Sequence, residues 1–310
     1  MTLYCCLSAL RVIKHQMNLK QLIAWSHSDQ PNTLKVLPSP FADSSHHILL
    51  QQFDDHIEVI KGLRDDAQDS PFWQGMHQLF GVTLSQQIAA FETCYPWLAQ
   101  HTPIPLPCWL QTVYNADAQP CGVRTHFLAG QPTQTEPLEQ AMVEQLADHL
   151  YHWHNLSSTR FGGLQQPQGE RQSWPKQLQD FLQTLPDASI SQRQLKQQSL
   201  QPLAAHPEAF MPEQFGVIMP DLRWDQFLVE AGRLALTDLD AVVFGPVALE
   251  WVLLEALLTE QQANWFLKAY PERPPTLAPV RQVYRAVLCQ LQVFGEQNAQ
   301  AWLNFPTWFD

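Results

Sequence analysis

Charged side chains are scarce in this sequence, and positive ones are scarcer than negative ones. Only 15% of the 310 residues are charged, with 18 Lys and Arg against 30 Asp and Glu, which gives a formal net charge of -12. Proteins that bind nucleic acids concentrate Lys and Arg to neutralise phosphates, so this composition indicates no nucleic-acid partner. The acidic balance fits a neutral or cationic small-molecule ligand better than an anionic one.

Long apolar runs are also missing. The longest, near Ala241–Leu258, is interrupted by Pro246 and two glutamates, so no membrane span is expected. The opening stretch, Met1–Gln30, lacks a basic segment, a signal-type apolar core and a cleavage site. Six cysteines are scattered without the spacing of metal ligands or of a disulfide framework. We therefore expect a reduced, cytoplasmic protein.

The type of predicted element changes about a third of the way along the chain. Two apolar runs flank a pair of aspartates and predict an antiparallel hairpin over Ile48–Lys61. Helical spacing follows over Pro71–Gln100, and two more strand-like segments end near Leu128. Beyond Pro137 the pattern is mostly helical, with one further short hairpin between Phe227 and Thr237. A strand-rich first third and a helix-rich remainder predict an α+β protein with two lobes.

The segment from Met219 to Asp240 has a pattern with a chemical interpretation. Asp221 is followed five residues later by an amide, Gln226, then by the short hairpin and a second acid, Asp238. This is the spacing of a kinase catalytic loop and its metal-binding segment. Phosphoryl transfer needs a carboxylate that orients the attacking hydroxyl and accepts its proton, and it needs oxygen ligands for Mg²⁺. The hairpin between the two acids is expected to bring both to one cleft.

From about Asn32 onward, the sequence resembles the aminoglycoside phosphotransferase/choline kinase-like family. The resemblance implies a two-lobed protein-kinase-like fold, with a small antiparallel-sheet N-lobe and a larger, mainly helical C-lobe. It implies that Lys61 binds the nucleotide phosphates and that Glu92, on the following helix, is its ion-pair partner. The hinge at the end of the N-lobe would place Phe127 and Leu128 beside the adenine of ATP.

The same resemblance assigns the roles in the central motif. Asp221 is the catalytic acid that orients the hydroxyl, and Gln226 and Asp238 are the Mg²⁺ ligands. Arg223 stands where many protein kinases have a cation that neutralises the transferring phosphate, so it is a second catalytic candidate. A structural ion pair with Asp225 is the alternative role for Arg223.

Three positions depart from the family pattern. Met219 stands where the family has His, Pro220 where it has Gly, and Gln226 where it has Asn. Gln offers the same carbonyl ligand on a side chain that is longer by one methylene. A glycine-rich phosphate loop is not recognisable before Ile48. Met219, Pro220 and Gln226 favour, as the alternative function, a pseudokinase that binds nucleotide or a partner without transferring phosphate.

Other polar residues near the motif receive structural interpretations. Glu250 follows a Gly-Pro element that resembles one of the family, and we expect it to brace the catalytic loop. Asp240 is either a second metal ligand or a member of a salt bridge or cap. His152 and His154 are two apart on a predicted helix and so point away from each other, which predicts core packing for His154 and no metal site.

The functional prediction is an ATP- and Mg²⁺-dependent phosphotransferase that moves the γ-phosphoryl group to a hydroxyl of a small molecule. The predicted parts are an N-terminal extension over residues 1–30, an N-lobe over 31–129 and a C-lobe over 130–310. The C-lobe is expected to hold the catalytic loop, the metal site and the acceptor-binding helices.

Overall fold

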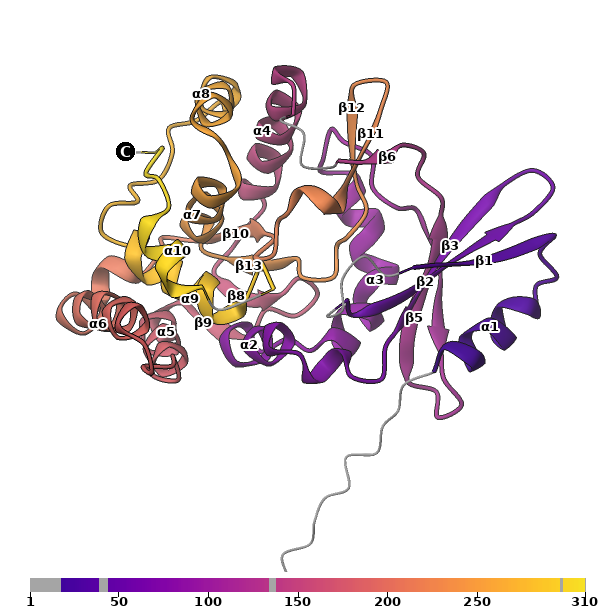
Figure 1. The fold of residues 1–310 in the computed structure, drawn as a ribbon, viewed down its shortest axis with the longest axis horizontal. Helices are drawn as coiled ribbons and strands as arrows, with labels where there is room; N and C mark the ends of the chain where they lie inside the picture. The colour runs from indigo at the N-terminus through magenta and orange to yellow at the C-terminus, as the bar shows by residue number, and fades with distance from the viewer. Residues whose placement is uncertain (1–17, 39–43, 134–137, 296–297, 310) are drawn as a thin grey trace, which may run out of the picture.

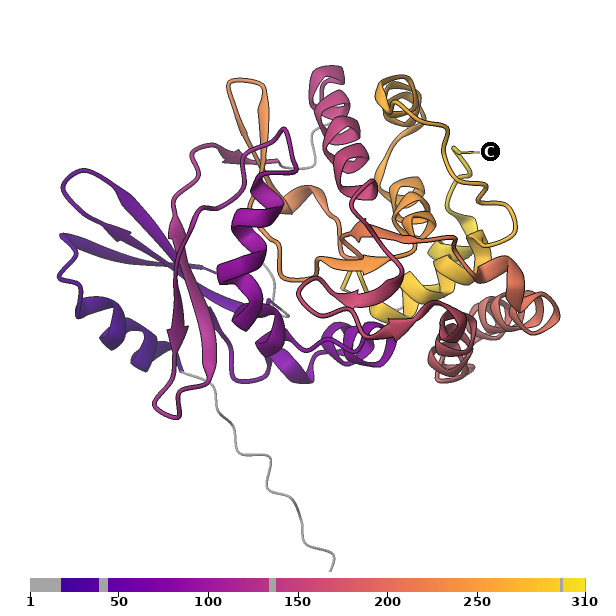
Figure 2. The same cartoon turned by 180° about the vertical axis from the view of Figure 1, so that it is seen from behind.

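The computed structural model describes residues 18–38, 44–133, 138–295 and 298–309, and it divides them between two lobes. In Figure 1 an antiparallel sheet dominates the smaller lobe, and most of the helices form the larger one. Figure 2 shows the same division from behind, with one long helix between the sheet and the larger lobe. The predicted α+β class with two lobes is confirmed.

Five antiparallel strands build the sheet of the smaller lobe in the order β1-β2-β3-β5-β4. They are β1 (Thr33–Leu37), β2 (His46–Gln52), β3 (Ile57–Leu63), β4 (Trp109–Tyr114) and β5 (Pro120–His126). The predicted hairpin is confirmed as β2 and β3, which pair along their whole lengths. Its turn is closed by the Phe53 N–H, which donates to the His56 carbonyl at 2.9 Å. This pairing places Lys61 opposite Ile48, two residues after His46 at the start of β2.

Helix α1 (Leu19–His27) covers one face of this sheet. Leu22 is fully buried, and a Cβ built at Gly62 would lie 2.4 Å from its Cδ2 atom, so a larger residue at that position would require the Leu22 side chain to move. The Gln51 side chain donates to the Ser26 carbonyl at 2.6 Å. The last part of the predicted N-terminal extension therefore packs on the N-lobe, while the boundaries at residues 30 and 129 stay predictions.

The helical region predicted over residues 71–100 is two helices, α2 (Pro71–Phe80) and α3 (Leu84–Ala99). Gly81 ends α2 in the left-handed conformation at φ 70°, and Thr83 caps α3 by accepting from the Gln86 N–H at 3.3 Å. The break lets the helices diverge: α3 packs on β4 and β5, whereas α2 packs on helices of the larger lobe.

The larger lobe contains seven α-helices among the described residues, together with two small sheets. The helices are α4 (Gln140–His154), α5 (Trp174–Gln183), α6 (Ile190–Ala205), α7 (Val247–Leu257), α8 (Glu260–Ala269), α9 (Arg281–Leu291) and α10 (Ala299–Asn304). One sheet has the order β7-β10-β13-β8-β9, formed by β7 (Ser157–Ser158), β8 (Arg160–Gly163), β9 (Gly169–Glu170), β10 (Phe215–Ile218) and β13 (Val243–Gly245). The other has the order β12-β11-β6, formed by β6 (Gln131–Pro132), β11 (Phe227–Glu230) and β12 (Arg233–Leu236).

The second predicted hairpin is confirmed as β11 and β12. Its two-residue turn has Ala231 at φ 49° and Gly232 at φ 76°, the left-handed values that a tight hairpin turn requires. Aromatic residues fill the core of the larger lobe: Trp153 and Trp251 are fully buried, and Trp251 meets Phe266 edge-on at 5.3 Å. No helix within the described part of the chain is long and apolar enough to cross a membrane.

Candidate active site

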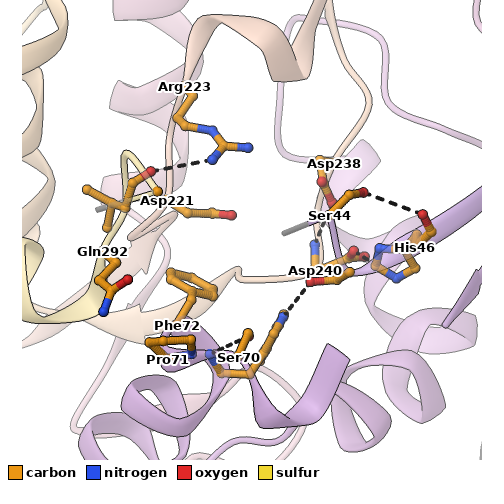
Figure 3. Close-up of a pocket in the computed structure, with 14 residues that line it drawn as sticks. Ser44, His46, Ser70, Pro71, Phe72, Asp221, Arg223, Asp238, Asp240 and Gln292 are labelled. Carbon is orange, nitrogen blue, oxygen red and sulfur yellow. Dashed lines mark hydrogen bonds and ion pairs between the residues drawn. The ribbon is translucent and has the colours of Figure 1, made fainter. Parts of the chain in front are cut away.

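The two acids of the central motif line one cavity between the lobes. Its walls come from the start of β2, the first turn of α2 and the loops that follow β10 and β12. Figure 3 shows Asp221 and Arg223 on one side of this cavity, with Asp238, Asp240 and His46 on the other. β10 and β12 both end in buried residues, and the loops that follow them line this one cavity.

Asp221 has one engaged and one unpartnered carboxylate oxygen. Its Oδ2 atom accepts from the Gln226 side-chain amide at 3.2 Å, and its Oδ1 atom is buried with no hydrogen-bond partner among the described residues. Burial and the negative charge of Asp238 raise the pKa of Asp221 to about 7, against the opposing effect of Arg223. A carboxyl group that titrates near neutral pH is suited to accept a proton.

Lys61 reaches across from the smaller lobe and pairs with Asp238. The Lys61 Nζ atom lies 3.1 Å from Asp238 Oδ1, and the lysine side chain is only 14% exposed. Burial alone would raise the pKa of Asp238, but the charges of Lys61 and His46 hold it far below its usual range. Asp238 is therefore the acid of this cavity that stays ionised, which suits a ligand for a cation.

The predicted ion pair between Lys61 and Glu92 is wrong in this structure, because Lys61 pairs with Asp238 instead. Phe91 and Tyr95, four residues apart, face the core from α3, whereas Glu92 lies about 100° further round the helix and is exposed. Two other α3 side chains lie near the acids. Gln87 donates to the Asp240 backbone carbonyl at 3.0 Å, and burial, Asp240 and Asp238 together raise the pKa of Tyr95 well above the usual value.

Phe127 and Leu128 follow β5, as the predicted hinge requires, but neither lines the cavity of Figure 3. Phe127 is 41% exposed, and its backbone N–H donates to the Ile57 carbonyl at 3.1 Å. Leu128 is half-buried. Their contact with adenine stays a prediction.

Arg223 lines the cavity and also makes the alternative contact considered for it. Its guanidinium forms a two-pronged pair with Asp225, at 3.1 Å from Nε to Oδ1 and 3.2 Å from Nη2 to Oδ2. Its Nη1 atom donates to the Val293 carbonyl at 3.4 Å. The planar guanidinium is thus held at the cavity wall by Asp225 of its own loop and by the backbone at Val293.

His46 and Asp240 form a contact that the sequence interpretation missed. The His46 Nε2 atom lies 3.3 Å from Asp240 Oδ2, and both side chains are buried. Burial and the neighbouring Lys61 lower the pKa of His46 to about 3, while burial and Asp238 raise that of Asp240 well above its ordinary value. No sequence signal links these residues, because they lie on different lobes.

The expectation that Glu250 braces the catalytic loop is confirmed. Its Oε1 atom accepts from the Met219 backbone N–H at 2.7 Å, and its Oε2 atom lies 2.6 Å from His154 Nε2. The other ring nitrogen of His154 lies 2.8 Å from the Tyr270 hydroxyl. Glu250 is fully buried, so this network fixes the backbone two residues before Asp221.

The donor set of the cavity fits a divalent cation that is shared with a phosphate ligand. No group of three or more His, Cys, Asp and Glu side chains within the described ranges is arranged as a metal cage. However, Asp221 Oδ1 and Asp240 Oδ1 are buried without hydrogen-bond partners. Mg²⁺ commonly uses one or two carboxylates together with substrate phosphates, so Asp238 and Asp240 would suffice on the protein side.

Comparison with known proteins decides the fold. The macrolide 2'-phosphotransferase MphH from Brachybacterium faecium is similar over 93% of this chain and 98% of its own, at 14% identity and a TM-score of 0.57. The GDP complex of aminoglycoside 2'-phosphotransferase-IIIa matches over 90% of each chain at 14% identity and 0.59. Aminoglycoside phosphotransferase APH(4)-Ia matches over 89% of this chain and 88% of its own at 18% identity and 0.58. This chain has the protein-kinase-like fold of the antibiotic phosphotransferases.

The resemblance seen in the sequence is therefore confirmed at the level of the phosphotransferase fold, over about nine tenths of the chain. No family model and no curated protein sequence matches the chain. The fold places the paired Lys61 and Asp238 between the two lobes, with Asp221 beside them in the cavity.

Proposed function

We propose that this protein is an ATP-dependent, Mg²⁺-dependent phosphotransferase that moves the γ-phosphoryl group to a hydroxyl of a small molecule. The observation that carries the proposal is the meeting of Lys61 from β3 with Asp238 from the larger lobe, beside the unpartnered oxygen of Asp221. Asp238 and Asp221 line the cavity, and Lys61 reaches it through its pair with Asp238. A cation, a strongly ionised acid and a near-neutral acid close together are the groups that phosphoryl transfer requires. A cytoplasmic location stays a prediction.

Each side chain has a role that follows from its surroundings. Asp221 orients the acceptor hydroxyl and takes its proton, because its carboxyl titrates near neutrality and its Oδ1 atom is unpartnered. Lys61 offers a positive charge to the nucleotide phosphates, and Arg223 offers a second one at the cavity wall. Asp238 would hold Mg²⁺, which neutralises charge on the phosphates when bound.

The acceptor is proposed to be a neutral or cationic hydroxyl compound. Three acids line the cavity with one arginine, and Phe72 adds an aromatic wall from α2. One similar structure is a complex of an aminoglycoside phosphotransferase with kanamycin, and another contains hygromycin B. Aminoglycosides, amino sugars and small amino alcohols are therefore the first compounds to test for ADP release.

A nucleotide-binding protein without transferase activity is the second candidate. The observation that favours it is the exposed position of Glu92. Glu92, the predicted partner of Lys61, is turned away from the cavity. Lys61 keeps a carboxylate partner, Asp238, so nucleotide binding does not depend on Glu92.

Thermal unfolding with nucleotide separates these candidates. A ligand at 100 times its Kd stabilises the folded state by about 2.7 kcal/mol. We expect ATP or GTP at millimolar concentration to raise Tm in the presence of Mg²⁺ and much less in its absence. A shift that is independent of Mg²⁺ favours the protein without transferase activity, and no shift with any nucleotide contradicts both candidates.

Replacing Lys61 tests the nucleotide site directly. Lys61→Met should weaken nucleotide affinity about 10- to 100-fold, because hydrogen bonds to charged groups contribute about 1.5–3 kcal/mol each. Isothermal titration with MgATP measures the change. Glu92→Ala is the matched control from the pair predicted in the sequence, and it should leave the affinity within about twofold, since Glu92 is exposed. Equal losses in the two variants would show that Lys61 has no special place in the site.

A further inference from the structure

Gln226 is held by the catalytic loop itself, at both ends of its amide. It lies in the single 3₁₀ turn η4 (Trp224–Gln226) and is only 3% exposed. Its Oε1 atom accepts from the Arg223 backbone N–H at 3.0 Å, and its Nε2 atom donates to Asp221 Oδ2 at 3.2 Å. The side chain therefore closes a bridge from the backbone at Arg223 to the carboxylate of Asp221.

The chemistry of these partners fixes the orientation of the amide. A backbone N–H is only a donor, and an ionised carboxylate is only an acceptor. Turning the amide over would place its NH₂ group against the Arg223 N–H and its carbonyl against Asp221, and would lose both hydrogen bonds. Hence the atom of Gln226 that faces Asp221 is a nitrogen, which cannot bind a cation, while its carbonyl oxygen faces the loop backbone.

The backbone of Gln226 is fixed as firmly as its side chain. Its carbonyl accepts from the Thr237 N–H at 2.9 Å and from the Thr237 hydroxyl at 2.8 Å, directly before Asp238. Among the described residues, the buried side-chain oxygens of the cavity without a hydrogen-bond partner are those of Asp221 and Asp240. The room for a further ligand is thus on the acids, and Gln226 has its polar atoms already engaged.

We infer that Gln226 is a positioning residue that orients the Asp221 carboxylate, and that it is not the Mg²⁺ ligand that its sequence position predicts. The inference rests on the proposed function. The extra methylene, compared with Asn, lets the amide reach back to the Arg223 N–H while its nitrogen holds Asp221. Mg²⁺ ligation is left to Asp238 and Asp240 on the other side of the cavity.

Three substitutions test the inference with ATP as the probe. Gln226→Met keeps the length and removes both hydrogen bonds, Gln226→Glu keeps the shape but cannot donate to Asp221, and Gln226→Asn is too short to span both partners. Each should lower the kcat for slow ADP release from MgATP, with water as acceptor, by about 10²-fold, the cost of a misplaced reacting group. The KM for MgATP and the Mg²⁺ dependence of the nucleotide Kd should stay within about twofold.

Gln145→Met is the matched control. The Gln145 amide also bridges backbone groups: it accepts from the Leu234 N–H at 2.9 Å and donates to the Gly232 carbonyl at 2.9 Å and the Ala141 carbonyl at 3.1 Å. Within the described part of the chain it contacts no acid of the cavity. It should leave kcat unchanged. Loss of Mg²⁺-dependent nucleotide affinity in Gln226→Met, or full activity of Gln226→Asn, overturns the inference alone. A wild-type chain that neither binds nucleotide nor releases ADP overturns the proposed function and this inference with it.

Discussion

Asp221→Asn should lower turnover about 10²–10⁴-fold, the usual contribution of a positioned general base, while the affinity for MgATP is retained. The substitution keeps the shape of the side chain but removes the charge that polarises and accepts the hydroxyl proton. The Gln226 amide can still donate to the remaining oxygen, so the loop need not move. Single-turnover rates measured beside nucleotide titration separate chemistry from binding.

The contrasting variant is Asp238→Asn. It removes the ionised acid that pairs with Lys61, so it should weaken nucleotide binding in the presence of Mg²⁺ and leave the weaker, Mg²⁺-free binding less affected. If both variants turn over at the wild-type rate with unchanged metal dependence, neither acid is in the catalytic site.

The pH profile offers a second measurement on Asp221. The carboxylate is the active form of a base, and the pKa of Asp221 is raised to about 7. The ionised fraction is therefore about half at pH 7, rises above it and falls about tenfold for each unit below it. The kcat/KM for the acceptor, which reports ionisations of the free enzyme, should fall with this slope on the acid side. In Asp221→Asn this limb of the residual activity should disappear.

Elements that depend on neighbouring residues could be predicted from the sequence. The β2–β3 and β11–β12 hairpins are each specified by a short turn between apolar runs, so their pairing needs no distant information. The catalytic loop and its second acid are joined by one of these hairpins, which explains why Asp221 and Asp238 could be placed at one cavity.

Features that depend on tertiary packing could not be predicted in the same way. The side of α3 that faces the core is set by its packing on β4 and β5. The sequence predicts that Glu92 lies on this helix, but it does not show which side of the helix faces the core. The partner of Lys61 and the contact between His46 and Asp240 both cross between lobes. The role inferred for Gln226 depends on the one methylene by which Gln is longer than Asn. Only the geometry of the loop shows that this length lets the amide contact both Arg223 and Asp221.

A buried network lies behind the loop that holds Asp221. Glu250 is fully buried, and its carboxylate is satisfied by two donors from different elements, the Met219 backbone N–H and the ring of His154. The family pattern has a His two residues before the catalytic acid, and this chain has Met219 there. The Met219 backbone N–H, which donates to Glu250, anchors the loop, and the Met219 side chain does not.

His154→Ala should lower the free energy of unfolding by about 3 kcal/mol, because it leaves an oxygen of the fully buried Glu250 carboxylate without its hydrogen-bond partner. Urea unfolding measures the change through a lower midpoint at a constant m-value. His152→Ala is the matched control: His152 lies on the same helix but is exposed, and its loss should cost at most about 0.5 kcal/mol. A His154→Ala variant as stable as the His152→Ala control would mean that Glu250 needs no donor from α4, and the catalytic loop would then be anchored by other contacts.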